Sequence, residues 1–415
     1  GVNDPPTPGP SISATFTQND SVSNVSLITG ASDPEGDPLT VADVSYNPEN
    51  PAGFQIVNDD SVEVTPSAYV SLNAGEQTVI EINYVIDDGA GNQTAQQTAT
   101  ITITGENDTA TIGGTATGGV IEDTSVADGQ LTANGTLSVG DVDTGQAVFS
   151  TAVTGQAGNL GTLIITDAGE WSYTLDNSLS GVQQLGAGTA ITDNFTVESI
   201  DGTASQEIVI TITGVNDLAV ISGNTVGGVT EDDSNPLTAS GELSITDVDA
   251  GEALFNTSAA GVGSVLGELT IDAQGTWNYT LDNTLAAVQE LPAGATLVEQ
   301  FEVKSFDDGT VETIVVTVTG INDVPVFGGA ITGSVTEDAA STLTTNGTLT
   351  IDDVDTDESS VSTTLTPTGA TLGTLFILST GEWTYEADNS QDAIQALVEN
   401  QSIEETFTVT SSDGS

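Results

Sequence analysis

Residues 208–217 read Ile-Val-Ile-Thr-Ile-Thr-Gly-Val-Asn-Asp, and residues 314–323 read Ile-Val-Val-Thr-Val-Thr-Gly-Ile-Asn-Asp. Apolar side chains recur at every second position and β-branched residues predominate, a pattern that predicts strands with one buried face. Residues 100–104 form a third such stretch, Thr-Ile-Thr-Ile-Thr. All three run into a Gly-x-Asn-Asp sequence, which indicates β-domains that end at a shared linker motif.

The linker motif also occurs at residues 1–4, so it is present four times. Its asparagines are 104, 109 and 106 residues apart (107 − 3, 216 − 107 and 322 − 216), the length of one immunoglobulin-sized domain. We therefore expect an all-β chain of four tandem, immunoglobulin-sized Greek-key β-sandwiches. The expected domains are residues 1–105, 106–214, 215–320 and 321–415.

Two features concern the ends of the sequence. The first six residues, Gly-Val-Asn-Asp-Pro-Pro, are neither an initiator methionine nor a signal peptide, so we expect an excerpt of a longer chain. The fourth domain lacks a counterpart of residues 312–320, its final strand, and is expected to be the least stable.

Several local patterns predict individual elements. Asn134-Gly135 and Asn346-Gly347 are dipeptides of type I′ turns, and residues 162–175 predict a hairpin that folds at 167–169. Single helical turns are expected within residues 178–185, 284–291 and 393–398. The alternation of Trp171, Tyr173 and Leu175 places all three on the core side of a strand, and the same pattern surrounds Trp277.

The composition excludes several classes of function. The 415 residues include 61 Asp and Glu against one basic residue, Lys304, with no His and no Cys, at a formal charge of -60. Such a chain cannot form the cationic surface that binds nucleic acid, and anionic membranes repel it. It has no Ser-His-Asp triad, no cysteine nucleophile and no soft ligands for zinc or copper.

A glycosidase needs a cleft, which tandem sandwiches seldom have, so we expect no enzyme activity. No stretch approaches 18 apolar residues, so no membrane insertion is expected.

Oxygen ligands for a hard cation are abundant. Asp141-Val-Asp143 places two carboxylates on one side of an extended segment, where they can share an ion, and calcium prefers six to eight oxygens. An EF-hand does not explain the motif, because Ala152 or Ser258 would occupy its twelfth position. The missing basic residues also fit a salty medium that screens the repulsion between acids.

Larger motifs show a family resemblance over essentially the whole chain. The first domain, with Ser32-Asp-Pro-Glu-Gly-Asp-Pro-Leu39 and Tyr84-Val-Ile-Asp-Asp-Gly89, resembles a bacterial cadherin-like domain. The other three resemble VCBS repeats; the second of the four domains carries Val120-Ile-Glu-Asp123, Asp141-Val-Asp143 and Gly169-Glu-Trp171. Such arrays occur in giant type I secreted, RTX-type adhesins of bacteria.

The resemblance implies that the four tandem Greek-key β-sandwiches are immunoglobulin/cadherin-like and arranged as an elongated rod. It also implies a calcium-rigidified extender, or stalk, on the bacterial cell surface that projects a distal ligand-binding region for cell adhesion or biofilm formation. The expected partners are calcium ions and neighbouring repeats of the same chain, which is expected to be monomeric. The alternative is a carbohydrate- or protein-binding adhesin module that uses the Trp-bearing repeats.

Cadherin-like architecture further implies that acids of two neighbouring domains and their linker share each calcium site. At the junction of the third and fourth domains the implied ligands are Glu231, Asp232, Asn322, Asp323, Asp353, Asp355 and Asp413. One junction earlier they are Glu122, Asp123, Asn216, Asp217, Asp247, Asp249 and Asp307 or Asp308. At the first junction Asn19 and Asp20 replace the upstream acids and join Asn107, Asp108, Asp141, Asp143 and Asp201, so weaker binding is expected. Incomplete sites are expected at Asn3 and Asp4, with Asp33, Glu35, Asp37, Asp87 and Asp88, and at Glu337 and Asp338.

Overall fold

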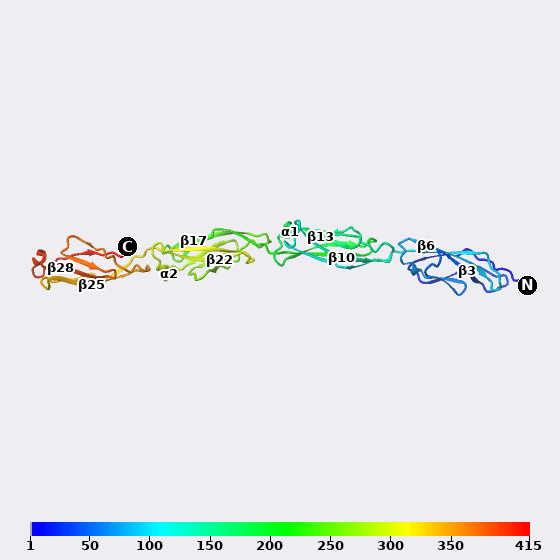
Figure 1. Cartoon of the computed structure of the whole chain (residues 1–415), viewed down its shortest axis with the longest axis horizontal. Coiled ribbons are helices and arrows are strands. Elements are labelled where there is room, and N and C mark those ends of the chain that lie inside the picture. The colour runs from blue at the N-terminus through cyan, green and yellow to red at the C-terminus, as the bar shows by residue number, and fades with distance from the viewer. Residues whose placement is uncertain (1) are drawn as a thin grey trace. The chain divides into compact units, whose positions relative to one another are not determined.

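The computed structural model of the chain describes residues 2–415, so Gly1, which begins the first linker motif and the first expected domain, lies outside the described residues. The chain is all-β, built from tandem β-sandwiches with a few single helical turns. Its internal contacts define two compact units, Gly1–Asn216 and Asp217–Ser415, and each unit contains two sandwiches. Figure 1 labels representative strands of each sandwich.

The first sandwich packs a four-stranded sheet, in the order β1-β7-β6-β3, on a three-stranded sheet, β2-β5-β4. Its core is formed by buried aliphatic residues of both sheets, among them Leu27, Val62 and Ile101. The elements are β1 (Ser13–Thr17), β2 (Ser23–Ser26), β3 (Thr40–Asn47), β4 (Phe54–Val57), β5 (Ser61–Val64), the 3₁₀ turn η1 (Pro66–Tyr69), β6 (Gln77–Asp87) and β7 (Gln97–Thr104).

The second sandwich pairs the sheet β12-β13-β10-β8 with the sheet β11-β14-β15-β9. Trp171, Tyr173 and Leu175 project into its core, as their alternation along the strand predicts. The elements are β8 (Thr111–Gly114), β9 (Thr117–Ile121), β10 (Gln130–Gly140), β11 (Thr154–Gly155), β12 (Thr162–Ile165), β13 (Glu170–Asp176), α1 (Ser180–Gln183), β14 (Ala190–Glu198) and β15 (Ser205–Thr213).

The third sandwich repeats this arrangement with the sheets β16-β18-β21-β20 and β17-β23-β22-β19. Trp277, Tyr279 and Leu281 occupy the equivalent core positions. The elements are β16 (Val220–Gly223), β17 (Val226–Thr230), β18 (Leu237–Thr246), β19 (Ala260–Gly261), β20 (Glu268–Ile271), β21 (Thr276–Leu281), α2 (Ala286–Gln289), β22 (Thr296–Lys304) and β23 (Val311–Thr319).

The fourth sandwich has one complete sheet, β24-β25-β28-β27, and a two-stranded sheet, β26-β29. Within residues 2–415 no strand of this sandwich occupies the place of β23, and Phe407 is only half-buried although its counterpart Phe301 is buried. The elements are β24 (Val326–Gly329), β25 (Thr342–Asp352), β26 (Thr366–Pro367), β27 (Gly373–Ile377), β28 (Glu382–Asp388), α3 (Asp392–Gln395) and β29 (Phe407–Thr408).

An early strand pairs in parallel with the last strand of each of the first three sandwiches. These pairs are β1 with β7, β9 with β15, and β17 with β23. The Gly-x-Asn-Asp linker follows the last strand directly, so the early strand and the linker meet at one end of the sandwich. This proximity brings acids that follow the early strand close to the linker.

The hairpin expected over residues 162–175 is confirmed as β12 and β13, and the three helical turns are confirmed as α1, α2 and α3. The two Asn-Gly turn predictions are wrong. Asn134-Gly135 lies inside β10, opposite Ser172 and Trp171, and Asn346-Gly347 lies inside β25. The glycine is required by packing rather than by a turn, because a Cβ on Gly135 would lie 2.4 Å from Cζ2 of Trp171.

A carboxylate fixes a loop in each of the last three sandwiches, and it is buried in the second and third but half-buried in the fourth. In the second, Asp193 is 1% exposed and accepts hydrogen bonds from the Tyr173 hydroxyl, at 2.8 Å, and from the backbone N–H groups of Leu160 and Gly161. Glu299 with Tyr279, and Glu405 with Tyr385, repeat the arrangement. Hydrogen bonding to these donors satisfies an otherwise costly buried charge.

The strand glycine beneath the tryptophan provides a test of the packing. A Cβ on Gly241 would lie 2.6 Å from the Trp277 ring, whereas a Cβ on Gly228 would meet nothing closer than the Thr317 carbonyl oxygen at 3.7 Å. We expect Gly241→Ala to lower the free energy of unfolding by about 1–3 kcal/mol through overpacking. Gly228→Ala, the matched control, should leave it nearly unchanged in urea unfolding. Equal effects of the two variants would contradict the packing argument.

Candidate cation sites

Each of the last three sandwiches has an Asp-Val-Asp turn that follows a long strand of its first sheet. The first aspartate accepts a hydrogen bond from the backbone N–H of the second. The Oδ1-to-N distances are 2.8 Å for Asp141 and Asp143, 2.9 Å for Asp247 and Asp249, and 3.0 Å for Asp353 and Asp355. This local bond is an Asx turn, which brings the two carboxylates together.

The second aspartate of the turn holds the linker. Its Oδ2 accepts the backbone N–H of the linker aspartate, at 2.9 Å between Asp143 and Asp108 and at 2.8 Å between Asp355 and Asp323. Asp249 and Asp217 make the same bond at 2.8 Å. One carboxylate oxygen of each turn thus fixes the direction in which the chain enters the sandwich.

The other oxygen of this aspartate is an unusual feature. Asp143, Asp249 and Asp355 are each only 2% exposed, and in each the Oδ1 atom is shielded from solvent without a hydrogen-bond partner anywhere in residues 2–415. A desolvated carboxylate oxygen without a donor is costly. A hard cation would satisfy this oxygen, so the residues present fit the calcium ion that the sequence predicts.

A third member of the turn was missed by the sequence analysis. Three residues after the second aspartate stand Gln146, Glu252 and Glu358, and each side chain has a shielded, unpartnered oxygen in the described part of the chain. Oxygens of Asp353, Asp355 and Glu358 lie within 4.8 Å of one another. The signal in the sequence is an Asp-x-Asp-x-x-Glu/Gln pattern at the same place in three repeats. The aspartate pairs are only the first half of this pattern.

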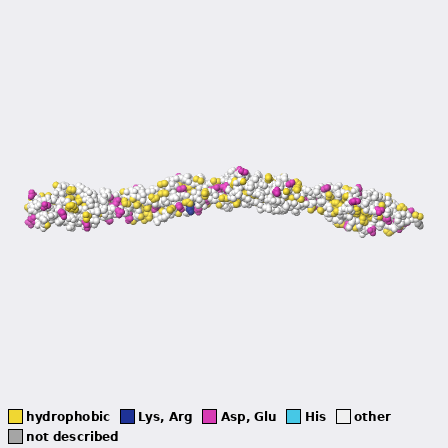
Figure 2. Space-filling view, in the orientation of Figure 1, with side chains coloured by type: hydrophobic (Ala, Val, Ile, Leu, Met, Phe, Trp, Pro, Cys, Tyr) yellow, Lys and Arg dark blue, Asp and Glu magenta, His cyan; other side chains and the backbone are white. Residues whose placement is uncertain are grey.

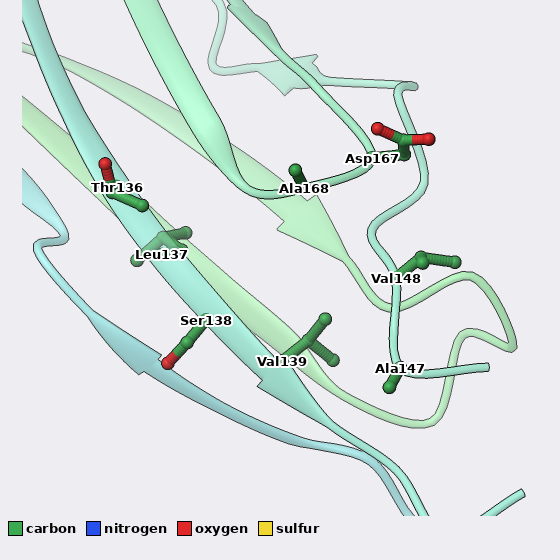
Figure 3. A pocket seen from close by; sticks show the side chains of 8 residues that line it. All are labelled: Thr136, Leu137, Ser138, Val139, Ala147, Val148, Asp167 and Ala168. Atoms are coloured by element: carbon green, nitrogen blue, oxygen red, sulfur yellow. The ribbon is translucent and has the colours of Figure 1, made fainter. Parts of the chain in front are cut away.

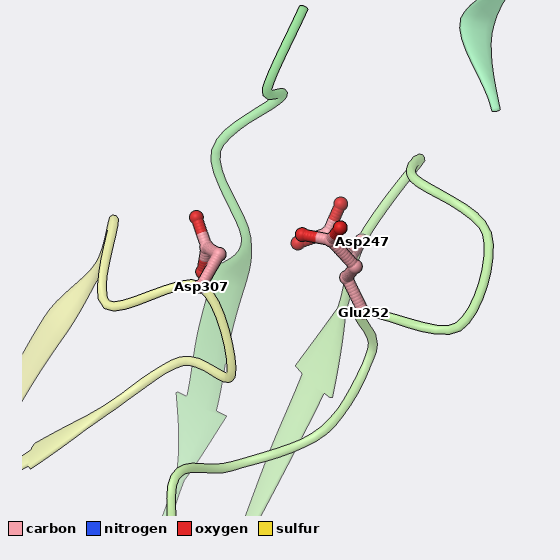
Figure 4. Close-up of side chains that lie close together, drawn as sticks. All are labelled: Asp247, Glu252 and Asp307. Atoms are coloured by element: carbon pink, nitrogen blue, oxygen red, sulfur yellow. The ribbon is translucent and has the colours of Figure 1, made fainter. Parts of the chain in front are cut away.

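The middle member of the series is drawn in Figure 4. Oxygens of Asp247, Glu252 and Asp307 lie within 4.8 Å of one another, and Asp307 approaches from the loop after β22. The sequence left Asp307 and Asp308 as alternatives. Asp307 joins the cluster, whereas Asp308 accepts a hydrogen bond from the Asn256 amide, at 3.0 Å.

The upstream acids fall into two groups with different contacts. Oε2 of Glu231 accepts the backbone N–H of Ile321 in the following linker, at 3.1 Å, and Glu122 accepts that of Val215 in the same way. Oε1 of each glutamate also accepts a side-chain amide, from Gln289 at 3.3 Å for Glu231 and from Gln183 at 3.1 Å for Glu122. The carboxylate of the next residue, Asp232, accepts amide hydrogen bonds from Asn283 and Gln289. Asp123 and Asp338 repeat this amide-bound arrangement with Asn177 and Gln183 and with Asn389 and Gln395.

The first sandwich differs from the sequence-based alignment by one residue. The backbone N–H of Gln18 donates to Thr104, just as that of Glu231 donates to Thr319. Gln18 therefore occupies the position of Glu231, and Asn19 the position of Asp232. The sequence analysis assigned these places to Asn19 and Asp20, because no acid marks the position.

The late turn residues also lie beside the linkers. The amide of Asn107 donates to Asp201 at 2.8 Å, and that of Asn322 donates to Asp413 at 3.2 Å. Hydrogen bonds from the Ser411 and Ser415 hydroxyls hold the pKa of Asp413 well below its usual range. Asp413 therefore stays ionised.

The N-terminal set is partly assembled. The Asn3 amide donates to Asp88, at 2.6 Å, the backbone N–H of Asp4 donates to Glu35, and Asp33 accepts from the backbone of Glu35 and Asp37. Desolvation raises the pKa of Asp88, but hydrogen bonds from Ala90, Asn92 and Asn3 outweigh it and lower the value to about 2. The side chain of Asp87 instead bonds Gly89 and Gln93 in its own loop. Glu337 is half-buried and forms no metal-type cluster among the described residues.

Carboxyl groups at the junction of the third and fourth sandwiches disfavour one another's ionisation. Desolvation and then the charges of Asp323, Asp232 and Asp355 raise the pKa of Glu231, although the Ile321 N–H opposes this. Desolvation and neighbouring acids likewise raise the pKa values of Asp323 and Glu358. The cluster therefore lacks positive charge, and acidic side chains are spread over the visible face with almost no basic ones (Figure 2).

A surface pocket in the second sandwich has no comparable chemistry. It is lined by residues of β10 and of the loops at 147–148 and 167–168 (Figure 3). Asp167 is the only ionisable side chain among its lining residues. α1, α2 and α3 are single turns, and no helix within residues 2–415 has the length and hydropathy to cross a bilayer.

Two segments match known domain families. Residues 3–104 match the bacterial Ig domain, and residues 322–415 match the bacterial cadherin-like domain. Both are structural and adhesion-type modules rather than enzymes and are typically extracellular, and cadherin-like domains generally bind calcium. Two segments of the chain thus match adhesion-type domains that are typically extracellular.

Solved structures similar to the chain are cadherin ectodomains. A protocadherin gammaB7 EC3-6 structure is 13% identical with a TM-score of 0.41, covering 98% of this chain and 95% of its own. Human desmocollin-1 is 13% identical with a TM-score of 0.29, covering 100% and 77%. Drosophila N-cadherin EC1-4 is 12% identical with a TM-score of 0.28, covering 97% and 95%. A comparison with curated protein sequences finds no significant match.

The raised pKa values predict how the cation-free chain responds to pH. A group whose pKa is higher in the folded state stabilises the fold below its ordinary pKa and loses that contribution as pH rises through the folded value. In chelator, the melting temperature should therefore fall as pH rises from about 4.5 to 7. Asp413, whose pKa is lowered, contributes a constant amount to the stability of the fold over this pH range.

The control separates this cluster from the general repulsion of an acidic chain. Replacing Glu231 and Glu358 together by Gln should flatten the pH dependence measured in chelator. The exposed pair Glu382 and Glu386 replaced by Gln, with the same change in charge, should flatten it much less. Equal flattening by both double variants would contradict a special role for the cluster.

Proposed function

We propose that the chain is a calcium-stiffened extender segment of a bacterial surface adhesin. The observation that carries the proposal is the shielded, unpartnered Oδ1 of Asp355, which lies in a turn that also bonds the linker at Asp323. A cation there would complete the carboxylate's coordination and restrain the linker in the same step. The same Asp-Val-Asp turn recurs in three sandwiches and bonds a linker each time. This repetition supports a role in extension rather than in catalysis.

The junction between the third and fourth sandwiches provides the proposed ligand set. Asp353, Asp355 and Glu358 come from one turn, Asp323 from the linker and Asp413 from the late turn of the fourth sandwich. Glu231 joins from the third sandwich, where the charges of Asp323 and Asp355 act on it. A divalent ion supplies the positive charge that this set lacks, and calcium suits an all-oxygen donor set.

Stiffening follows from where the ligands originate. Side chains of two sandwiches and the linker between them converge, so a shared ion restricts the bending of one sandwich against the other. We infer the same role for the Asp141 turn, a cation site within the third sandwich at the Asp247 turn, and partial sites around Asp33 and Asp88. Asp123, Asp232 and Asp338 are better explained as turn residues, since their carboxylates accept hydrogen bonds from side-chain amides of their own sandwich rather than from a linker backbone.

The wider role extends this proposal. We propose domains at residues 1–105, 106–214, 215–320 and 321–415, the last three of VCBS type, in a type I secreted, RTX-type protein. The extracellular, adhesion-type domain families matched here support that setting. A monomeric stalk that projects a distal binding region for adhesion or biofilm formation would use these domains as spacers.

The Trp-based alternative has less support. Trp171 is 2% exposed and Trp277 is fully buried, and each indole Nε1 donates to a backbone carbonyl oxygen at 2.8 Å. A stacking platform for sugars needs an accessible ring face. We therefore do not retain glycan binding by these residues as a second function.

Scattering and melting of the whole chain test the stiffening. A site with a dissociation constant near 10⁻⁵ M contributes about 2.7 kcal/mol at roughly 1 mM calcium. We expect calcium to raise the melting temperature and to increase the radius of gyration, as bending at the linkers decreases. Chelator should reverse both changes. Identical scattering profiles and melts in calcium and in chelator would refute the proposal.

A single substitution tests the site. Asn at position 355 can still accept the Asp323 N–H, and its amide donor would then face the neighbouring carboxylates. Asp355→Asn should therefore raise the melting temperature in chelator and reduce the calcium increment from about 2.7 to under about 1 kcal/mol at this junction. The exposed Glu386→Gln has the same charge change and should leave the calcium increment intact.

A further inference from the structure

The junctions within the two compact units are built from different side chains. Between the third and fourth sandwiches, Glu231 and Glu358 contribute carboxylates. Between the first and second, Gln18 occupies the position of Glu231 and Gln146 that of Glu358. Amides thus replace two acids at equivalent places, and an amide can donate hydrogen bonds where a carboxylate can only accept them.

Gln18 uses this capacity within the first junction. Its side chain is 0% exposed, and its Nε2 donates to Asp108 Oδ2 at 2.9 Å and to the Glu106 carbonyl oxygen at 2.8 Å. The equivalent oxygen at the other junction, Asp323 Oδ2, is shielded and has no hydrogen-bond partner in the described chain. Gln18 therefore gives Asp108 the donor that Asp323 lacks.

Side-chain contacts also connect the first two sandwiches directly. Thr144 donates to the Ser71 carbonyl oxygen twice, from its backbone N–H at 3.2 Å and from its hydroxyl at 2.8 Å. Gln146 Nε2 donates to Asn73 Oδ1 at 2.9 Å. At the other junction the corresponding contact is one backbone bond, from Thr356 to Glu290 at 3.2 Å.

We propose that Gln18 and Gln146 replace a divalent cation in ordering the first junction. The linker at residues 105–110 then keeps its structure when divalent cations are removed, whereas the linker at 320–325 loses its structure. The second half of this statement rests on the proposed function, and the first half does not. The chain accordingly combines a joint that is fixed at any cation level with a joint that responds to the cation.

The first junction also keeps oxygens that a cation could bind. Asp141 Oδ2 and Asp143 Oδ1 remain shielded and unpartnered within residues 2–415, as do the Oε1 atoms of Gln18 and Gln146. These two amide oxygens are neutral, so the set carries less negative charge than its counterpart and should bind calcium more weakly. Cation binding at this junction is therefore not needed to order the linker at residues 105–110, because the amide donors already hold it.

Hydrogen exchange measured by mass spectrometry on the full chain, in calcium and in chelator, tests the inference. Peptides that cover residues 320–325 should exchange at least about tenfold faster in chelator, and peptides that cover 105–110 should change by less than about twofold. A calcium response of similar size at both linkers would overturn the inference while leaving the proposed function intact. No response at either linker would instead overturn the proposed function.

A matched pair of variants addresses Gln18 itself. Gln18→Glu restores an acid at the position and should make exchange at 105–110 calcium-dependent, by about tenfold. Gln96→Glu, an exposed position in the same sandwich, makes the same chemical change and should leave that linker insensitive. An insensitive linker in Gln18→Glu would overturn the role of the amide. If that variant unfolds the first sandwich, exchange in the unmodified chain still decides the inference.

Discussion

A buried aspartate at the end of a long strand fixes the linker that enters each of the last three sandwiches. In Asp143, Asp249 and Asp355 one carboxylate oxygen bonds the linker backbone and the other is shielded from solvent without a donor. The linker bond requires the aspartate to be buried, and burial leaves its second oxygen in need of positive charge. The chain has one basic residue, so its own side chains supply almost no positive charge to these oxygens.

The sandwich topology explains why these groups gather at the domain ends. The early strand of each of the first three sandwiches pairs in parallel with the last, so residues after the early strand lie beside the linker that follows the last one. Glu122 and Glu231 reach the linker backbone by this route. A substitution in one of these strands can therefore affect a junction without altering any residue of the linker.

The three repeats show how one scaffold can differ in electrostatics. Gln146, Glu252 and Glu358 stand at the same position of the Asp-Val-Asp turn, and Gln18 stands where later sandwiches have glutamate. Exchanging a carboxylate for an amide changes both the charge and the ability to donate hydrogen bonds. The backbone that surrounds these side chains, including the linker bond to the buried aspartate, stays the same.

The sequence by itself determined the β-architecture, the hairpin of residues 162–175, the buried faces of the tryptophan strands and the aspartate pairs, because these depend on local alternation and on repeats in register. Glu252 and Glu358 follow these pairs at a fixed spacing, so the sequence contained that signal too. Only the tertiary structure chose Asp307 over Asp308 and moved the upstream position from Asn19 to Gln18. These results depend on which side chains converge from distant strands. The Asn-Gly pairs illustrate the same limit, since Gly135 is needed for the ring of Trp171, a contact 36 residues away in sequence (171 − 135) that no local pattern contains.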